Sequence, residues 1–159
     1  MSDERVVWRR TTGRVLPVDG SGRVLLFYGF DPHRPDEPFW FTIGGGVEPG
    51  ESLQEAAVRE LREETGIVVD ASALGEPVES STVEFSWSGY AVVQAQTFFA
   101  VGVGAATISL DGLDAIEKAT TIDYRWWSGD ELEACGDAYP DGLPALLRLA
   151  AESAAGSYR

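Results

Sequence analysis

Hydrophobic residues in the first quarter of the chain form short runs separated by turn residues. Residues 10–18 and 23–30 are rich in Val, Leu and aromatic side chains, and the segment 19–22, Asp-Gly-Ser-Gly, lies between them. This pattern predicts two β-strands joined by a hairpin. Residues 31–38 include three prolines and predict a loop, after which residues 39–43 predict a short strand that stops at three consecutive glycines.

A helical pattern follows over residues 52–65. Ser52 can cap this helix, Glu55 stands three residues later as a capping-box partner, and Gly66 follows as a stop signal. One face of the predicted helix carries an apolar stripe that can dock on a sheet, made of Leu53, Ala56, Ala57 and Leu61.

The second half of the chain continues with strands and ends in helices. Strands are predicted at 79–87, 90–103 and 123–127 and helices at 130–134 and 143–152, whereas 104–120 is weakly patterned. Strands and helices mixed in this way, without regular βαβ repeats, predict an α+β or α/β class with a mixed sheet between helices. A length of 159 residues fits one domain covering 1–159.

Composition limits the chemistry that the chain can perform. Cys135 is the only cysteine and His33 the only histidine, so an internal disulfide, a zinc site and most histidine-based catalytic schemes are disfavoured. A bound metal would therefore be held mainly by oxygen ligands, which favours Mg²⁺ or Mn²⁺. We expect a cytoplasmic protein without membrane contact, because no apolar run reaches membrane-spanning length and residues 1–10 do not resemble a signal peptide.

The charge balance is strongly acidic. The formal net charge is -14, and such a surface repels the phosphate backbone of nucleic acids. We therefore expect no nucleic acid polymer among the partners. An anionic small substrate would meet the same field unless metal ions offset it locally.

Three glutamates gather on one face of the predicted helix. Glu63 and Glu64 follow Glu60 by three and four residues, and this spacing brings side chains together on a helix. Like charges at these positions repel by roughly 0.2–0.5 kcal/mol per pair, which a solvated face tolerates. The same three carboxylates can instead supply oxygen ligands to a divalent cation.

The loop before this helix is suited to close contact with a ligand. Gly44, Gly45 and Gly46 permit unusual dihedral angles, and their backbone groups can face a metal or phosphate oxygens. Glu51 stands at the start of the helix, where the helix dipole favours a carboxylate.

Together the loop and the helix resemble the signature of the Nudix hydrolase family. That signature is a glycine, five residues, a glutamate, seven residues, and then Arg-Glu-aliphatic-any-Glu-Glu-any-Gly-aliphatic. This sequence supplies Gly45, then Glu51, and then Arg59 to Ile67 with every fixed position matched. In looser form the resemblance extends over nearly the whole chain and implies an α/β/α sandwich.

The resemblance implies a role for each residue of the motif. Glu60, Glu63 and Glu64 would bind the metal, and Glu60 would also activate the attacking water. Arg59 would orient the catalytic carboxylates, and Gly45 would offer its carbonyl to the metal. Glu51 would support the metal ligands or the loop through indirect contacts, without binding the metal itself. Glu117, which precedes the last predicted strand, is a candidate for the further acid that many members take from a late loop; an ordinary surface glutamate is the alternative.

The resemblance also implies a reaction class: cleavage of a pyrophosphate bond in a nucleoside-diphosphate-linked small molecule with Mg²⁺ or Mn²⁺. Markers of several substrate subfamilies are absent, which leaves (deoxy)nucleoside triphosphates, including oxidised ones, slightly ahead. Arg10 could meet distal phosphates or ribose, and Tyr28 and Trp40 are candidates for stacking on a base, with a packing role as the alternative.

Two other functions remain open at this point. A Nudix-fold domain that binds a nucleotide without turning it over is one, although such domains usually have eroded motif carboxylates. An isopentenyl diphosphate isomerase is the other, but it calls for a catalytic cysteine in the sheet, and Cys135 lies in a late helix. A homodimer is possible by analogy with the family.

Overall fold

The computed structural model describes residues 7–157; residues 1–6, which belong to the N-terminal segment considered above, and 158–159 lie outside the described residues. The strands are β1 (Val7–Val18), β2 (Val24–Gly29), β3 (Phe39–Phe41), β4 (Ile43–Gly46), β5 (Glu79–Trp87), β6 (Tyr90–Gly102) and β7 (Thr121–Trp127). The helices are α1 (Leu53–Thr65), a 3₁₀ turn (Ala71–Leu74), α2 (Ala115–Thr120), α3 (Gly129–Ala134) and α4 (Leu143–Ser157).

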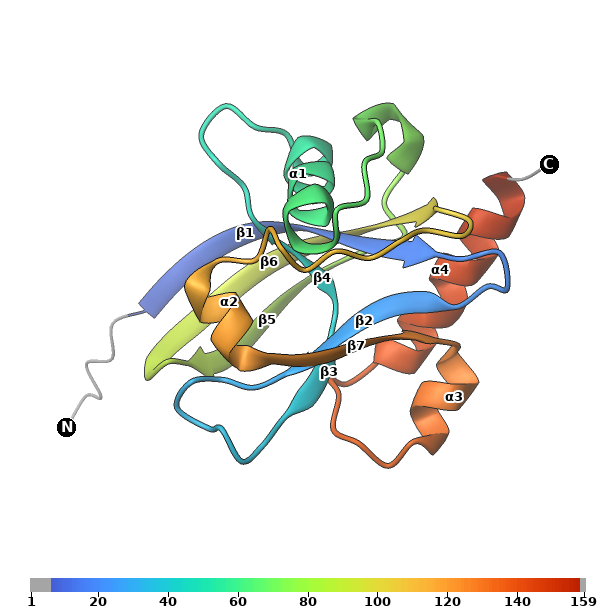
Figure 1. The fold of residues 1–159 in the computed structure, drawn as a ribbon. Coiled ribbons are helices and arrows are strands. Elements are labelled where there is room, and N and C mark those ends of the chain that lie inside the picture. The colour runs from blue at the N-terminus through green and yellow to red at the C-terminus, as the bar shows by residue number, and fades with distance from the viewer. Residues whose placement is uncertain (1–6, 158–159) are drawn as a thin grey trace.

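The strands form one mixed sheet with the order β3-β2-β1-β6-β5 (Figure 1). β1 runs parallel to β6 along its whole length, whereas β5 is antiparallel to β6 and β4 is antiparallel to β1. β1 and β2 are paired only at Val18 and Val24, next to their hairpin turn, while β2 pairs with β3 and β7. The sheet therefore has two parts, β4-β1-β6-β5 and β3-β2-β7, that diverge from this hairpin.

Successive residues of the central strands point into two different cores. Val15 and Phe99 belong to the cluster beneath α1, whereas Leu16 and Phe98 belong to the cluster that α3 and α4 cover. This alternation is the ordinary property of a strand, and here both sides are buried because helices lie on both faces. The prediction of a mixed sheet between helices is confirmed.

Local sequence signals set the ends of α1. Ser52 accepts a hydrogen bond from the Glu55 backbone N–H at 3.0 Å, and the Glu55 carboxylate accepts one from the Ser52 N–H at 3.0 Å. Gly66 ends the helix in the left-handed region with φ 79°. The capping box and the glycine stop predicted from the sequence are both present, and they fix where the helix face begins and ends.

Several boundaries differ from the sequence predictions. The three glycines do not end a strand but form most of β4, which pairs with β1 from Thr12 to Val15. Gly44 has φ 145°, and a Cβ there would overlap the backbone of Gly13 and Arg14, so this close pairing requires glycine. α2 lies within the stretch that showed little pattern, and its capping box joins Asp114 and Glu117. Within residues 7–157, no helix is long and apolar enough to span a membrane.

Candidate active site

A large cleft opens on the face of β1, β6 and β5 that α4 covers only in part. Its volume is about 1110 Å³, and β3 and the loop after β2 line its other side. Gly44, Gly45, Gly46, Glu60, Glu64 and Glu117 line one end of it. The segment with the strongest sequence signal therefore contributes directly to the wall of a cavity of ligand size.

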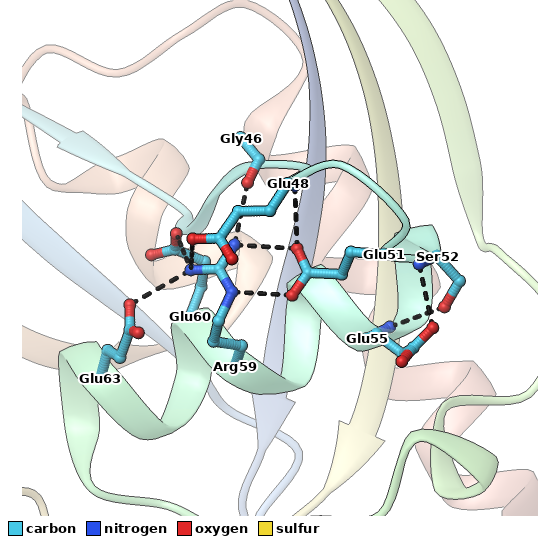
Figure 2. Close-up of polar contacts among 8 residues, drawn as sticks. All are labelled: Gly46, Glu48, Glu51, Ser52, Glu55, Arg59, Glu60 and Glu63. Atoms are coloured by element: carbon cyan, nitrogen blue, oxygen red, sulfur yellow. Dashed lines mark hydrogen bonds and ion pairs between the residues drawn. The ribbon is translucent and has the colours of Figure 1, made fainter.

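Arg59 is the centre of a polar network at this end (Figure 2). Its Nε and Nη2 hold the two oxygens of Glu51 at 2.8 and 3.0 Å, and Nη2 also donates to the Gly46 carbonyl at 2.9 Å. Its Nη1 donates to Glu60 at 2.9 Å and to Glu63 at 3.2 Å. The hydrogen bonds to Glu51 and Glu60 raise the pKa of Arg59, so this guanidinium is a permanent positive charge that ties the loop to the helix.

The Glu60 carboxylate lies directly against the backbone of Gly45. A Cβ on Gly45 would overlap this carboxylate, so only glycine allows the strand to approach it. Burial raises the pKa of Glu60, while the hydrogen bond from Arg59 lowers it. This carboxylate is therefore held in one place and is a stronger proton acceptor than an exposed glutamate.

Glu64 is the most deeply buried of the helix glutamates, at 6% exposure. It accepts a hydrogen bond from the Gly44 N–H at 3.0 Å. Burial, and then the charge of Glu60, raise the pKa of Glu64 well above its usual value. Burial likewise raises the pKa of Glu117. Glu60, Glu64 and Glu117 all line the cleft, and the charge of Glu117 adds to burial in raising the pKa values of the other two.

This donor set fits a divalent cation, because a cation would offset the repulsion among buried carboxylates and accept their oxygens as ligands. No ion pair joins Glu64 to a basic side chain in the described part of the chain. Among residues 7–157 no three Asp, Glu, His or Cys side chains are grouped closely enough to hold a metal ion by themselves. Glu63 lies outside the cleft, 45% exposed and paired with Arg59.

Two arginines supply positive charge beside the carboxylates. Arg10 and Arg14 both line the cleft from β1. Arg14 donates through Nε to Thr42 Oγ1 at 3.1 Å and through Nη2 to the Thr42 carbonyl, while burial lowers its pKa and the Glu64 charge raises it. The buried Nε of Arg10 has no hydrogen-bond partner among the described residues. The sequence indicated Arg10, but it carried no signal for Arg14, which stands in a run of strand residues.

The two aromatic residues expected to stack on a base lie elsewhere. Trp40 is 4% exposed, its ring packs 4.7 Å from that of Tyr28 and 5.0 Å from that of Trp127, and its Nε1 donates to Asp137 at 3.1 Å. Neither Trp40 nor Tyr28 is among the residues that line the cleft. Because neighbours on a strand point to opposite faces, Phe39 and Phe41 face the cleft instead. From the sequence, Tyr28 and Trp40 are candidates for stacking on a base, but in the structure both residues pack against other side chains instead of lining the cleft.

A buried aspartate joins the two sides of the cleft. Asp31, which is 5% exposed, accepts hydrogen bonds through Oδ1 from the backbone N–H groups of His33 at 3.0 Å and Ser88 at 3.1 Å. Ser88 lies in the turn between β5 and β6, whereas Asp31 follows β2. The two parts of the sheet are thus connected at the cleft as well as at their shared hairpin.

Comparison with known proteins identifies this arrangement. The chain matches the family model described as the NUDIX domain over residues 8–149. The chain belongs to the Nudix family. The match includes the motif from Gly45 to Ile67 and all the strands that line the cleft, so the carboxylate cluster described above stands in a Nudix hydrolase domain.

Individual relatives give the range of proteins that this Nudix domain is similar to. A Bacillus subtilis (strain 168) protein named as a candidate 8-oxo-dGTP diphosphatase is 58% identical over 59 residues, which are 37% of this chain and 36% of that relative. An RNA pyrophosphohydrolase of Bradyrhizobium diazoefficiens is 30% identical over 128 residues, 74% of this chain and 76% of the relative. The first relatives are matched over only about a third of their length.

The fold is shared with solved Nudix-type structures. A crystal structure of a MutT protein from Methanosarcina mazei Go1 matches with a TM-score of 0.64, at 24% identity, over 96% of this chain and 99% of that one. This likeness establishes the α/β/α arrangement of the sheet and helices.

Proposed function

We propose that this Nudix domain is a divalent-metal-dependent pyrophosphohydrolase that acts on small nucleotides. The observation that carries the proposal is that Glu60, Glu64, Glu117, Arg10 and Arg14 all line one cleft of about 1110 Å³. A cleft of this size accommodates a nucleotide. The carboxylates would bind a metal ion, and the arginines beside them would bind the phosphates that the metal ion also contacts.

The metal would be Mg²⁺ or Mn²⁺, held by Glu60 and Glu64 with the backbone carbonyl of Gly45. Glu63 is a further candidate ligand, which would have to exchange its contact with Arg59 for the metal. When bound, the cation supplies neutralisation of phosphate charge and activation of water. Glu51 would act indirectly, because it holds the Arg59 guanidinium that positions Glu60.

The residues of the chain then share the work of one hydrolytic step. A water oxygen attacks a phosphorus, the bridging P–O bond breaks, and its electron pair leaves with the departing phosphate. Glu60, which Arg59 holds and whose pKa is raised by burial, accepts the proton of the water. Glu117 is a second candidate carboxylate for this role, because burial raises its pKa as well. Arg10 and Arg14 place positive charge beside the phosphate oxygens.

Within this class, we favour (deoxy)nucleoside triphosphates, including oxidised ones, as substrates. The relatives carry names that refer to 8-oxo-dGTP, to CTP and to RNA. A net charge of -14 opposes a polymeric phosphate backbone more than it opposes a single nucleotide whose charge a metal offsets. We therefore favour free nucleotides over RNA 5′ ends as substrates.

A hydrolysis panel tests the proposal. Phosphate and pyrophosphate release would be measured with Mg²⁺ and with Mn²⁺ on the common and oxidised nucleoside triphosphates, ADP-ribose, NADH, diadenosine polyphosphates, nucleotide sugars and a triphosphorylated RNA. We expect metal-dependent cleavage of triphosphates that EDTA abolishes. Cleavage of no compound, together with a nucleotide-induced rise in melting temperature, would instead support a domain that binds nucleotides without turning them over.

A further inference from the structure

A chain of polar side chains crosses the part of the cleft that the motif does not reach. Gln94 and Gln96 stand two residues apart on β6 and therefore share a face, and the strand register places Ser81 of β5 opposite Gln96. Gln94 Nε2 donates to Gln96 Oε1 at 3.0 Å, and Gln96 Nε2 donates to Ser81 Oγ at 3.1 Å. All three residues line the cleft. We call Gln94, Gln96 and Ser81 the amide ladder.

The amide ladder leaves hydrogen-bonding capacity unused. Each glutamine amide has two N–H donors and an acceptor oxygen, and the ladder uses one N–H of each. Within the described residues no partner is recorded for the second N–H of either amide or for Gln94 Oε1. Gln94 is only 7% exposed, but none of these unused groups is among the buried polar atoms of residues 7–157 that lack a partner, so they face the cleft. A polar ligand in the cleft can therefore reach them.

Apolar surfaces flank the amide ladder. On one side Trp8, Val92 and Phe85 form a cross-strand row, since Val92 pairs with both of the other two residues. Phe39 and Phe41 line the cleft from β3. A ligand that satisfies both surroundings has apolar faces and a polar edge, which describes a heteroaromatic base.

The position of Arg10 relates this region to the carboxylate end. Arg10 is paired with Gln94 in the register of β1 and β6, and it carries the buried Nε without a partner. Its Nη2 lies 3.6 Å from the position that a Cβ on Gly46 would take. Arg10 thus stands between the amide ladder and the glycine strand, so that one extended ligand can place phosphates at the motif and a base on the ladder.

We propose that Gln94, Gln96 and Ser81 bind the hydrogen-bonding edge of the base, an inference that rests on the proposed function. An amide presents a donor and an acceptor, and the Ser81 hydroxyl can donate or accept, so the order of donors and acceptors along the ladder can be reversed. The ladder can therefore pair with adenine, which offers an amino group, with uracil, which offers carbonyl groups, and with cytosine and guanine, which offer both.

The test measures kcat and KM for ATP, GTP, CTP, UTP and inorganic tripolyphosphate with Mg²⁺. The variants are Gln94→Leu and Gln96→Met, which keep the size of the side chain and remove the hydrogen bonds, and Gln96→Glu, which offers only acceptors. Gln54→Leu on α1 is the matched control, because Gln54 does not line the cleft. Thermal melts establish that each variant is folded.

Because a lost bidentate contact to a base changes discrimination about tenfold or more, we expect Gln94→Leu and Gln96→Met to raise KM for all four nucleotides by about that factor. Their kcat for nucleotides and their rates with tripolyphosphate should stay within about twofold of the wild type, since the carboxylate end is untouched. Gln96→Glu should favour ATP, CTP and GTP over UTP by about tenfold, because a carboxylate accepts from the amino groups of adenine, cytosine and guanine, and uracil has no amino group.

Two results would overturn the inference: unchanged nucleotide KM values in the ladder variants, or an equal loss with tripolyphosphate, which has no base. If the wild-type protein cleaves nothing, the proposed function fails, and equilibrium dialysis of ATP tests the ladder separately. In that experiment Gln94→Leu should weaken binding about tenfold. An affinity equal to that of the wild type would remove the ladder from the binding site.

Discussion

The two ends of the cleft are built in different ways. Most of the carboxylate end comes from one continuous segment, in which β4 and α1 place Gly45, Glu60 and Glu64 within about twenty residues of one another, and Glu117 is added from α2. The amide ladder comes from β5 and β6, and the strand register alone brings its side chains together. At the first end, the helix face and the close strand pairing fix the sequence spacing of the residues. At the second end, the side chains can change while the sheet stays the same. Under the proposed function, the first end would carry the reaction chemistry and the second would bind the base.

The largest effect is expected from Glu60→Gln. Removing a general base typically lowers the rate about 10²–10⁴-fold, and we expect a kcat lower by about 10³-fold with all substrates. The melting temperature should not fall, because the change removes a charge from a repelling group of carboxylates. Glu55→Gln is the control, since glutamine also serves in a capping box. A near-normal kcat in Glu60→Gln would show that another group takes the proton.

Gly45→Ala tests whether the glycine strand positions the catalytic carboxylate. The new Cβ would overlap the Glu60 carboxylate and displace it. Because a displacement of about 1 Å can cost about 100-fold in rate, we expect a fall in kcat of about 10- to 100-fold. Gly20→Ala is the matched change, since a Cβ there meets nothing within 4 Å. If the two alanine variants have the same activity, the close approach has no catalytic importance.

Arg59→Met tests the network that holds the carboxylate end in place. The change leaves Glu51, Glu60 and Glu63 without their shared partner, and Glu51 is only 14% exposed. Since losing one member of a largely buried ion pair is costly, we expect the free energy of unfolding to fall by about 2 kcal/mol, measured by urea denaturation. Arg59→Lys should recover only part of this, because lysine cannot hold Glu51 with two bonds. Equal stability of Arg59→Met and the wild type would contradict the role of the network.

The smallest effect is expected outside both ends of the cleft, at the surface ion pair of Arg23 and Glu131, which are 2.7 Å apart. The hydrogen bond from Arg23, and then the N–H of Ser128, lower the pKa of Glu131 to about 2. A lowered carboxyl pKa stabilises the fold above the unfolded value of about 4.5, and this stabilisation is lost as the pH falls towards 2. Melting temperatures from pH 6 to pH 2 should fall less steeply for Glu131→Gln, and salt should reduce the difference. Activity at neutral pH should not change; an altered kcat would mean that this pair influences the cleft.

Local signals in the sequence predicted much of the fold and of the carboxylate end. The capping box of Ser52 and Glu55, the stop at Gly66 and the turn before β2 act within a few residues, so each can be recognised without knowledge of the tertiary structure. Glu117 could be proposed from its position ahead of the last strand, and its capping box with Asp114 is a signal for α2 that the weak apolar pattern concealed.

Features that depend on long-range pairing could not be predicted in the same way. The spacing of Gln94 and Gln96 shows that they share a face, but the partner Ser81 and the face itself depend on the register of β5 and β6. The sequence indicates Tyr28 and Trp40 as candidates for stacking on a base. Which side of β3 faces the cleft depends on the fold, and Trp40 lies in the core, whereas Phe39 and Phe41 line the cleft. The burial of Arg14 likewise depends on the antiparallel pairing of β4 with β1, in which Arg14 lies opposite Gly44.

The central claim, that a divalent cation binds at the carboxylate end, is tested most directly by titration of Mn²⁺ and detection of the free ion by electron paramagnetic resonance. We expect the wild-type protein and Glu55→Gln to bind Mn²⁺ with the same affinity. Glu60→Gln and Glu64→Gln should each bind at least about tenfold more weakly, because each loses an oxygen ligand with its charge. Equal Mn²⁺ affinity in all four proteins would contradict the account and would place the metal, and with it the reaction, elsewhere.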